Sequence, residues 1–222
     1  MIIQEIINHN LPILKPSDSV ADALNWMEEN RIGQLAVGLD DKYLGMVSED
    51  FLHNYDENLL ISDLIYQFPD VFLFNEQHIY EALRLISQYQ LHILPILDSE
   101  HTLIGIVPAS AIYSKFAELL NTQELGGILV ISMNNRDYSL AEISRLVESN
   151  NARILSSYFS GNYSVSNEEN STLTIKLNTE SIQPIIATLE RYGYSIEGSF
   201  AHEPIESIEQ ERYHMLMKYL SV

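Results

Sequence analysis

Two short stretches of the chain share an opening, and only the first retains side chains suited to a phosphorylated ligand. "GMVSEDFL" (45–52) has a hydroxyl at Ser48 followed by two acidic residues, whereas "GIVPASAI" (105–112) has Pro108 and Ala111 instead. Amides at the start of a helix favour anions, and a carboxylate accepts hydrogen bonds from neighbouring hydroxyls. Proline offers neither a side-chain nor a backbone donor. The sequence therefore predicts a weakened ligand cradle at Ser48 and none at Pro108.

The two stretches belong to an internal repeat with an offset of 59 to 60 residues. "SVADALNWMEENRIGQLAV" (19–37) corresponds to "HIYEALRLISQYQLHILPI" (78–96), and a fixed period of this size indicates one supersecondary unit used twice. In each unit a helical pattern precedes two short apolar runs separated by a polar turn, which predicts a helix and a strand hairpin. Ser19 and Asp22 resemble a capping box at the first helix start. The predicted helical stripes are Val20, Leu24 and Met27 in the first copy and Ile79, Leu83 and Ile86 in the second.

These units resemble a tandem pair of cystathionine-β-synthase (CBS) domains, also called a Bateman module, over residues 1–117. The resemblance rests on the repeat, the order of elements, the central Ala-Leu pairs and the glycine-apolar-apolar-Ser/Thr motif. It implies βαββα units that form a pseudo-symmetric pair through their sheets. It also implies adenosine-containing ligands in two clefts and further association into dimers. We place repeat 1 at residues 1–60 and repeat 2 at residues 61–120.

The resemblance also implies which residues line the clefts. In the family motif a hydroxyl faces phosphate and an Asp three residues later binds ribose. Here Ser48 matches the hydroxyl, Phe51 occupies the Asp position, and Asp50 lies one residue early, a rotation of about 100° on a helix. Each cleft combines one repeat's motif with the other repeat's helix start and first strand, by analogy. The resulting candidate ligand-binding residues are Ser48, Asp50, Ala82, Leu91, His92 and Ile93.

The ligand expected from this resemblance is AMP, ATP or S-adenosylmethionine, acting as a regulatory ligand, with no cofactor required. The alternative from the residues themselves is that Ser48 only caps the following helix. In that case the two motif glycines only permit close packing of the backbone.

A second domain is predicted after "NTQELGG" (121–127), where the pattern changes. Over residues 126–201 the order β-α-β-β-α-β indicates the split-βαβ, ferredoxin-like arrangement, with two helices on one face of a four-stranded antiparallel sheet. "NNRDYSLAEISRLVESNNARIL" (134–155) resembles the first half of an ACT domain, a regulatory module that often binds amino acids. The expected fold class is therefore α+β, with two CBS repeats followed by a C-terminal ACT-like domain.

The loop after the first strand of this domain holds another set of candidate residues. ACT domains place a glycine there so that the backbone can approach the ligand, and the matching position in this chain is Tyr138. Asn134, Asn135 and Asp137 could still accept hydrogen bonds from an effector. The alternative is an ordinary polar turn with Ser139 as the N-cap of the next helix, in an ACT-like domain that serves dimerisation.

Composition and charge restrict the partners. The 222-residue chain has a formal net charge of −19, with 12 Lys+Arg against 31 Asp+Glu, which argues against nucleic acid as a partner. There is no cysteine, no basic leader followed by an apolar run, and no stretch of about 20 apolar residues. We therefore expect a cytoplasmic protein that does not bind a membrane. Residues 202–222 form an acidic tail whose apolar spacing predicts an interaction helix.

Recognised catalytic and metal-binding motifs are absent from the sequence. None of the seven histidines forms an H-E-x-x-H pair, and no P-loop, dinucleotide fingerprint or nucleophile elbow occurs. We expect a non-catalytic regulatory or sensor protein whose ACT-like domain mediates regulation or dimerisation. Its domain order resembles that of acetoin-utilisation regulatory proteins. The alternative is a degenerate interaction scaffold that has lost the ligand. A homodimer, a small-molecule effector and a downstream protein partner are expected.

Overall fold

The chain divides into two compact units, Met1–Phe116 and Ala117–Val222. The structure is a computed structural model, and it describes residues 2–67, 69–134, 137–161 and 170–201. Each unit has its own apolar core, formed by two clusters in the first unit and by one in the second.

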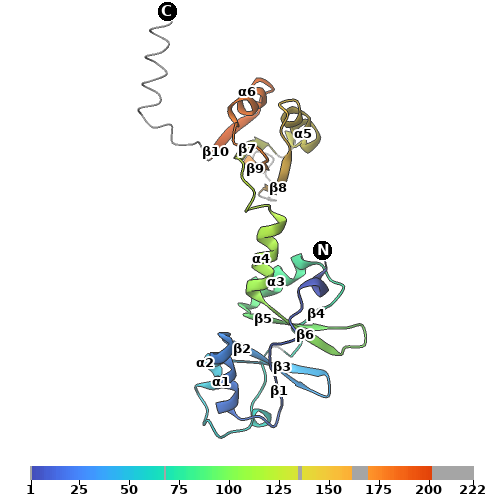
Figure 1. The fold of residues 1–222 in the computed structure, drawn as a ribbon, viewed down its shortest axis with the longest axis vertical. Helices are drawn as coiled ribbons and strands as arrows, with labels where there is room; N and C mark the ends of the chain where they lie inside the picture. The colour runs from blue at the N-terminus through green and yellow to red at the C-terminus, as the bar shows by residue number, and fades with distance from the viewer. Residues whose placement is uncertain (1, 68, 135–136, 162–169, 202–222) are drawn as a thin grey trace, which may run out of the picture. The chain divides into compact units, whose positions relative to one another are not determined.

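The first unit contains the same succession of strands and helices twice (Figure 1). The first copy consists of β1 (Ile13–Leu14), α1 (Val20–Asn30), β2 (Gln34–Leu39), β3 (Lys42–Ser48) and α2 (Glu49–Leu52). The second consists of β4 (Leu73–Phe74), α3 (Ile79–Tyr89), β5 (Ile93–Leu97), β6 (Leu103–Pro108) and α4 (Ala109–Leu119). In each copy the first strand pairs in parallel with the second, which pairs antiparallel with the third. The predicted βαββα repeat is confirmed.

Helix α1 begins at the capping box that the sequence predicts. The Ser19 hydroxyl accepts a hydrogen bond from the Asp22 N–H at 3.1 Å, and the Asp22 carboxylate accepts one from the Ser19 N–H at 3.1 Å. These two bonds satisfy donors that have no partner inside the helix. Val20 and Met27 are buried as expected, but Ala23 is fully buried while Leu24 is only partly buried. The predicted buried face of α1 is therefore wrong at its central position, where Ala23 takes the place expected for Leu24.

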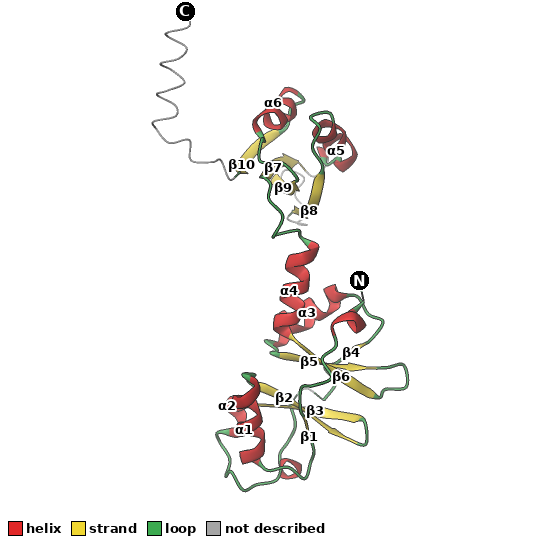
Figure 2. Cartoon of the chain, in the orientation of Figure 1, coloured by secondary structure: helices red, strands yellow, loops and turns green. Residues whose placement is uncertain are grey.

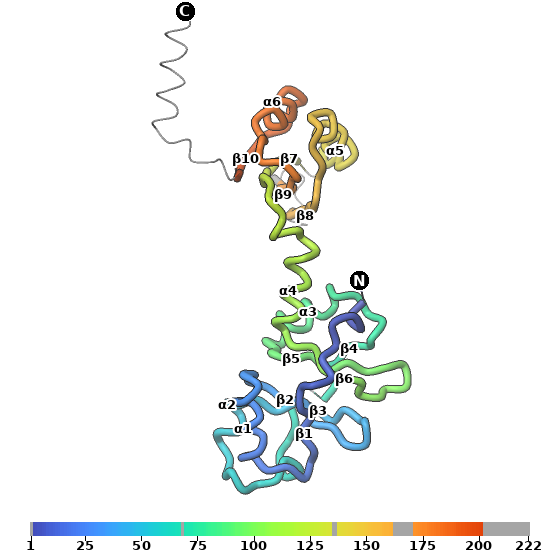
Figure 3. Tube along the Cα trace, viewed as in Figure 1, coloured from blue at the N-terminus to red at the C-terminus, as the bar shows by residue number. Residues whose placement is uncertain are grey.

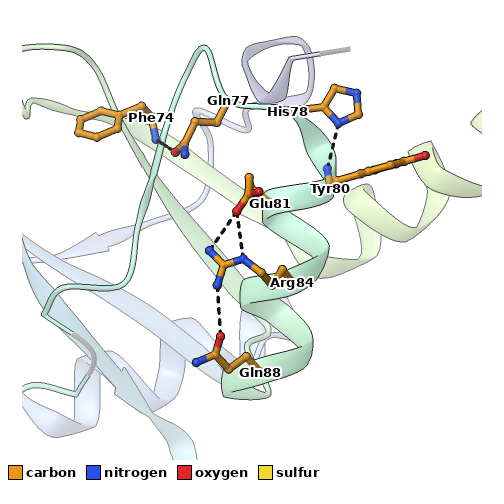
Figure 4. A network of polar contacts seen from close by, with 7 residues as sticks. All are labelled: Phe74, Gln77, His78, Tyr80, Glu81, Arg84 and Gln88. Atoms are coloured by element: carbon orange, nitrogen blue, oxygen red, sulfur yellow. Dashed lines mark hydrogen bonds and ion pairs between the residues drawn. The ribbon is translucent and has the colours of Figure 1, made fainter. Parts of the chain in front are cut away.

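Helix α3 carries its polar contacts on the exposed side (Figure 4). His78 is the N-cap, and its Nδ1 accepts a hydrogen bond from the Tyr80 N–H at 3.3 Å. One turn later Arg84 donates to Glu81 Oε2 at 3.0 Å and to Gln88 Oε1 at 3.3 Å. Exposed pairs of this kind contribute little to stability. The buried face of α3 consists of Ile79, Ala82, Leu85 and Ile86, with the predicted Leu83 only partly buried.

In each repeat, the segment that leads into the first strand packs on the other repeat. The N-terminal segment, with the 3-10 helix η1 (Ile3–Ile6), runs along repeat 2, where the Asn8 N–H donates to the Ile106 carbonyl at 2.8 Å (Figure 3). The segment with the 3-10 helix η2 (Ile61–Asp63) packs on repeat 1, and Ile61 is fully buried in that core. The two repeats are thus interlocked.

The two motif glycines make this interlocking sterically feasible. Gly45 has φ +149, and a Cβ added there would lie 2.6 Å from Tyr66 Cβ and 3.0 Å from the Gln67 carbonyl oxygen. Gly105 has φ +159, and a Cβ there would collide with Ile7. Side chains rarely adopt such φ values. Close backbone packing is therefore one function of the shared motif.

The second unit is a split-βαβ, ferredoxin-like domain (Figure 2). Its elements are β7 (Ile128–Asn134), α5 (Leu140–Glu148), β8 (Ile154–Ser160), β9 (Asn170–Leu177), α6 (Gln183–Arg191) and β10 (Ser195–Phe200). The strands form one antiparallel sheet in the order β10-β7-β9-β8. Residues of α5 and α6 share one buried cluster with alternate residues of β7 and β9, so both helices cover the same face of the sheet. This confirms the predicted α+β class.

Several sequence expectations concern residues or boundaries that stay predictions. The acidic tail 202–222 and its expected helix lie outside the described residues. The bounds 1–60, 61–120 and 126–201 also stay predictions. Among the described residues, no helix combines the length and apolar character that crossing a bilayer would require.

Candidate functional site

Ser48 lies at the end of β3, opposite Gln34 of β2. It occupies the N-cap position of α2, but its hydroxyl makes no capping hydrogen bond to that helix. The Glu49 N–H instead donates to the Gly33 carbonyl at 3.0 Å. The side chain of Ser48 is partly buried. The alternative role of Ser48 as a side-chain cap is therefore wrong, and the hydroxyl is left to interact with something else.

The structure brings His92 of repeat 2 to the same place. The His92 N–H donates to Gln34 Oε1 at 2.8 Å, and Gln34 is the cross-strand neighbour of Ser48. A Cβ added to Gly33 would lie 2.6 Å from His92 Nδ1 and 4.0 Å from Glu49 Oε2. The His92 side chain is exposed. We call this meeting point, formed by Gly33, Gln34, Ser48, Glu49 and His92, the repeat seam.

Three of the six candidate residues are buried. Ala82 and Ile93 are fully buried in the repeat 2 core, and Leu91 is 2% exposed. A ligand cannot contact Ala82 or Ile93 unless the core opens. Leu91 and His92 line a surface depression of about 540 Å³ between α3 and Tyr113 of α4, and its lining does not include Ser48 or Asp50.

The acidic candidate Asp50 is exposed on the four-residue helix α2. Phe51, at the position where the family has its ribose-binding Asp, packs against the repeat 1 core with its ring centroid 5.0 Å from that of Tyr55. Phe51 is therefore a packing residue. Any carboxylate contact to a ligand has to come from Asp50 or Glu49.

Negative charge dominates the repeat seam. The Glu49 carboxylate lies at the seam, and its Oε1 is 3.8 Å from Nε2 of His53, with both side chains exposed. A helix of four residues has only a small macrodipole to offset these acids. The seam therefore offers hydrogen bonds and carboxylates, and it suits a neutral or cationic ligand better than a phosphate.

The corresponding position in repeat 2 lacks these groups. Pro108 pairs with Ile93, and the Ala109 N–H donates to the His92 carbonyl at 2.9 Å, which mirrors the Glu49–Gly33 bond of repeat 1. The backbone symmetry is retained while the hydroxyl and the acid are lost.

The candidate loop residues of the second unit border a polar cavity of about 590 Å³. Asn134 and Asp137 line it, and Asn134 Nδ2 donates to Asp137 Oδ2 at 3.1 Å. Asn135 lies outside the described residues. Tyr138 is not part of the lining, and its ring meets that of Phe159 edge-on at 4.9 Å. The expected N-cap at Ser139 is confirmed, because its hydroxyl accepts the Glu142 N–H at 3.3 Å.

Two further residues of this cavity were not predicted. The hydroxyl of Tyr194 donates to Glu142 Oε2 at 2.8 Å, and both residues line the cavity. Burial, together with this hydrogen bond and the negative charge of Glu142, raises the pKa of Tyr194 to about 12. The pair joins the start of α5 to the start of β10, 52 residues apart in sequence. No local motif signals such a contact.

In the described part of the chain, no three His, Asp or Glu side chains are grouped so that they could hold a metal ion.

The geometry of the first unit agrees with comparison to known proteins. Residues 3–50 and 62–118 each match the CBS domain family, so the N-terminal half of this chain is a tandem CBS domain pair. A solved structure with a similar fold is a CBS domain pair/ACT domain protein from Thermotoga maritima. It is 24% identical, with a TM-score of 0.50, and the match covers 54% of this chain and 99% of that one. This likeness is one of fold.

Two other similar proteins either share a smaller part of their length with this chain or have a lower TM-score. An inosine-5'-monophosphate dehydrogenase from Korarchaeum cryptofilum is 27% identical over 129 residues, which is 58% of this chain and 26% of that enzyme. The chain thus corresponds to about a quarter of the length of this curated relative. The structure of CBSX2 in complex with AMP is 24% identical with a TM-score of 0.45, covering 53% of this chain and 96% of that one.

Proposed function

We propose that the chain is a non-catalytic regulatory protein whose CBS pair binds an adenosine-containing ligand at the repeat seam. The observation that supports this most is that the Ser48 hydroxyl does not cap helix α2. Ser48 lies at the start of that helix, and it shares Gln34 as a neighbour with the exposed His92 of the other repeat. A ligand there would touch both repeats at once. Its binding would therefore bias how the two repeats are held together.

The charges at the seam favour S-adenosylmethionine over AMP or ATP. Glu49 and Asp50 are both exposed on α2, and opposite charges attract while like charges repel. S-adenosylmethionine carries a sulfonium cation, whereas AMP and ATP carry phosphates. Because the ring of His92 is exposed beside Gly33, it is the candidate contact for the adenine base.

For the second unit we propose an ACT-like role in dimerisation or in regulation by a small-molecule effector. Its polar cavity, bordered by Asn134, Asp137, Glu142 and Tyr194, is the candidate effector site. We propose a homodimer that presents itself to a downstream protein partner in the cytoplasm. Light scattering at micromolar concentration should give twice the chain mass, and a monomer mass would contradict the dimer. A role in acetoin utilisation is a prediction from domain order alone.

The second candidate function is an interaction scaffold without ligand. It is favoured by one observation: Phe51 stands where the family has its ribose-binding acid and is used for packing against Tyr55. A scaffold would keep the interlocked repeats and make no use of the free Ser48 hydroxyl.

A thermal-shift screen of the full chain distinguishes these two functions. The panel is S-adenosylmethionine, AMP and ATP, each up to millimolar concentration. A ligand present at about 100 times its dissociation constant adds about 2.7 kcal/mol to the free energy of unfolding. We expect stabilisation by S-adenosylmethionine above that by AMP and ATP. Stabilisation by none of the three would favour the scaffold.

A further inference from the structure

A second cavity of the first unit lies at the turn between β2 and β3, at the opposite end of β2 from Ser48. It has a volume of about 330 Å³. Its apolar wall is formed by Ile13, Gly38 and Leu39 of repeat 1 and by Leu103 of repeat 2. Its charged residues are Lys15, Asp40 and Asp41. The cavity is thus built jointly by the two repeats and is separate from the repeat seam.

The internal repeat explains why this cavity is open. Leu14 pairs with Val37 as Leu73 pairs with Ile96, which makes Ile13 equivalent to Phe72 and Lys15 equivalent to Phe74. In the same alignment Gly38 corresponds to Leu97. Tyr43 corresponds to Leu103, because each lies two residues before the motif glycine of its repeat.

At the equivalent place, aromatic rings fill the space. The ring centroids of Tyr43 and Phe72 are 6.3 Å apart, those of Phe72 and Phe74 are 5.5 Å apart, and those of Phe74 and His101 are 5.2 Å apart. The chain therefore packs one of two equivalent positions with large rings. It leaves the other lined by a glycine, aliphatic side chains and unlike charges.

Those charges are not neutralised by one another. In the described part of the chain, no ion pair or side-chain hydrogen bond joins Lys15 to Asp40 or Asp41. All three residues are exposed. Asp40 and Asp41 form the turn itself, with φ of 48 and 60, where glycine or asparagine would be easier to accommodate. A cavity with an ammonium group, two carboxylates and an apolar wall matches a molecule that carries both charges and a small apolar group.

We propose that this cavity binds a free α-amino acid with a small aliphatic side chain. The ligand carboxylate would pair with Lys15, the ligand ammonium with Asp40 and Asp41, and the side chain would lie against Ile13 and Leu103. A volume of about 330 Å³ is at the small end of ligand pockets, which favours a molecule of the size of valine over a nucleotide. Such a ligand is neutral overall, so the net charge of −19 does not repel it.

The test uses the full chain and valine together with its two halves. Isovalerate is valine without the amine, and isobutylamine is valine without the carboxylate. Thermal unfolding is followed by the fluorescence of Trp26, the single tryptophan, which packs on the repeat 1 core. We expect a saturable rise in Tm with valine up to about 10 mM, and at least about tenfold weaker effects of each half, since each loses one charged contact.

Variants locate the effect. A Cβ at Gly38 would lie 3.1 Å from Ile13 Cγ2 and 3.2 Å from Leu103 Cδ2, so Gly38→Ala narrows the cavity and should abolish the shift. Lys15→Met should weaken valine binding about threefold or more. The double variant Asp40→Asn/Asp41→Asn should do the same, and asparagine tolerates the positive φ of both positions. Ser48→Ala and Asp137→Asn, at the seam and in the cavity of the second unit, should leave the shift unchanged.

The proposal is overturned if valine gives no shift, or if the shift survives both Gly38→Ala and Lys15→Met. Loss of the shift in Asp137→Asn would move the amino-acid site to the second unit and would equally refute it. Isovalerate as effective as valine would contradict a ligand with both charges. None of these results depends on whether an adenosine ligand binds at the seam.

Discussion

Replacement of Gly45 by alanine tests whether the motif glycine exists to let the two repeats interlock. The new methyl would lie 2.6 Å from Tyr66 Cβ and 3.0 Å from the Gln67 carbonyl oxygen, and neither atom can move without its backbone. Met46 and Gln67 exchange two backbone hydrogen bonds at this point, of 2.7 and 2.8 Å. A side chain at φ +149 adds conformational strain of about 1–3 kcal/mol, and overpacking adds about 1–3 kcal/mol. We expect a total loss of about 2–6 kcal/mol.

The assay is urea unfolding followed by the fluorescence of Trp26, which reports on the first unit alone. Gly33→Ala is the matched control. Its added Cβ also has a neighbour at 2.6 Å, but that neighbour is Nδ1 of the exposed His92 ring, which can rotate away, and Gly33 has no positive φ. We expect the control to lose less than about 1 kcal/mol. A Gly45→Ala chain as stable as the control would refute the interlocking role.

Two further predictions concern single hydrogen-bonded pairs. Ser19→Ala removes the acceptor of the Asp22 N–H and should lower the free energy of unfolding of the first unit by about 1 kcal/mol; an unchanged urea midpoint of Trp26 fluorescence would contradict the capping box. Tyr194→Phe removes the 2.8 Å bond to Glu142 and should destabilise the second unit by about 1–2 kcal/mol in circular dichroism. Because the pKa of Tyr194 is raised from 10.0 to about 12, its contribution is intact below pH 10 and is lost as the pH rises through 12. Tyr194→Phe should therefore lack this alkaline loss, and an identical pH profile would contradict the assignment.

Local sequence signals predicted the elements of this fold well. β2 (Gln34–Leu39) is the first of the two short apolar runs expected in repeat 1, and the polar turn follows it directly. The capping pair Ser19 and Asp22 marks the start of α1 for the same reason: the interaction spans three residues. Such features depend only on neighbours in the chain.

The candidate sites were harder to predict, because they depend on contacts between distant segments. Ala82 and Ile93 were assigned to a ligand cleft by analogy, yet their burial depends on the packing of α3 on β5, which spacing does not reveal. Glu142 and Tyr194 meet across 52 residues, and the cavity beside Gly38 includes Leu103 from the other repeat. These positions are brought together only by the tertiary fold. The resemblance to CBS pairs placed His92 opposite Ser48, and in the structure Gln34 is the backbone partner of Ser48 and the hydrogen-bond acceptor of the His92 N–H.

Titration calorimetry with S-adenosylmethionine on the parent chain, Ser48→Ala and Pro108→Ala tests the proposed function most directly. If the ligand binds at the repeat seam, Ser48→Ala should weaken binding about fivefold or more, which corresponds to about 1 kcal/mol for a lost hydrogen bond. Pro108→Ala should bind as the parent does, because Pro108 offers no donor. Asp50→Ala shows whether the exposed acid contributes. Saturable binding that Ser48→Ala leaves unchanged and Pro108→Ala abolishes, or no heat of binding at millimolar ligand, would contradict the account.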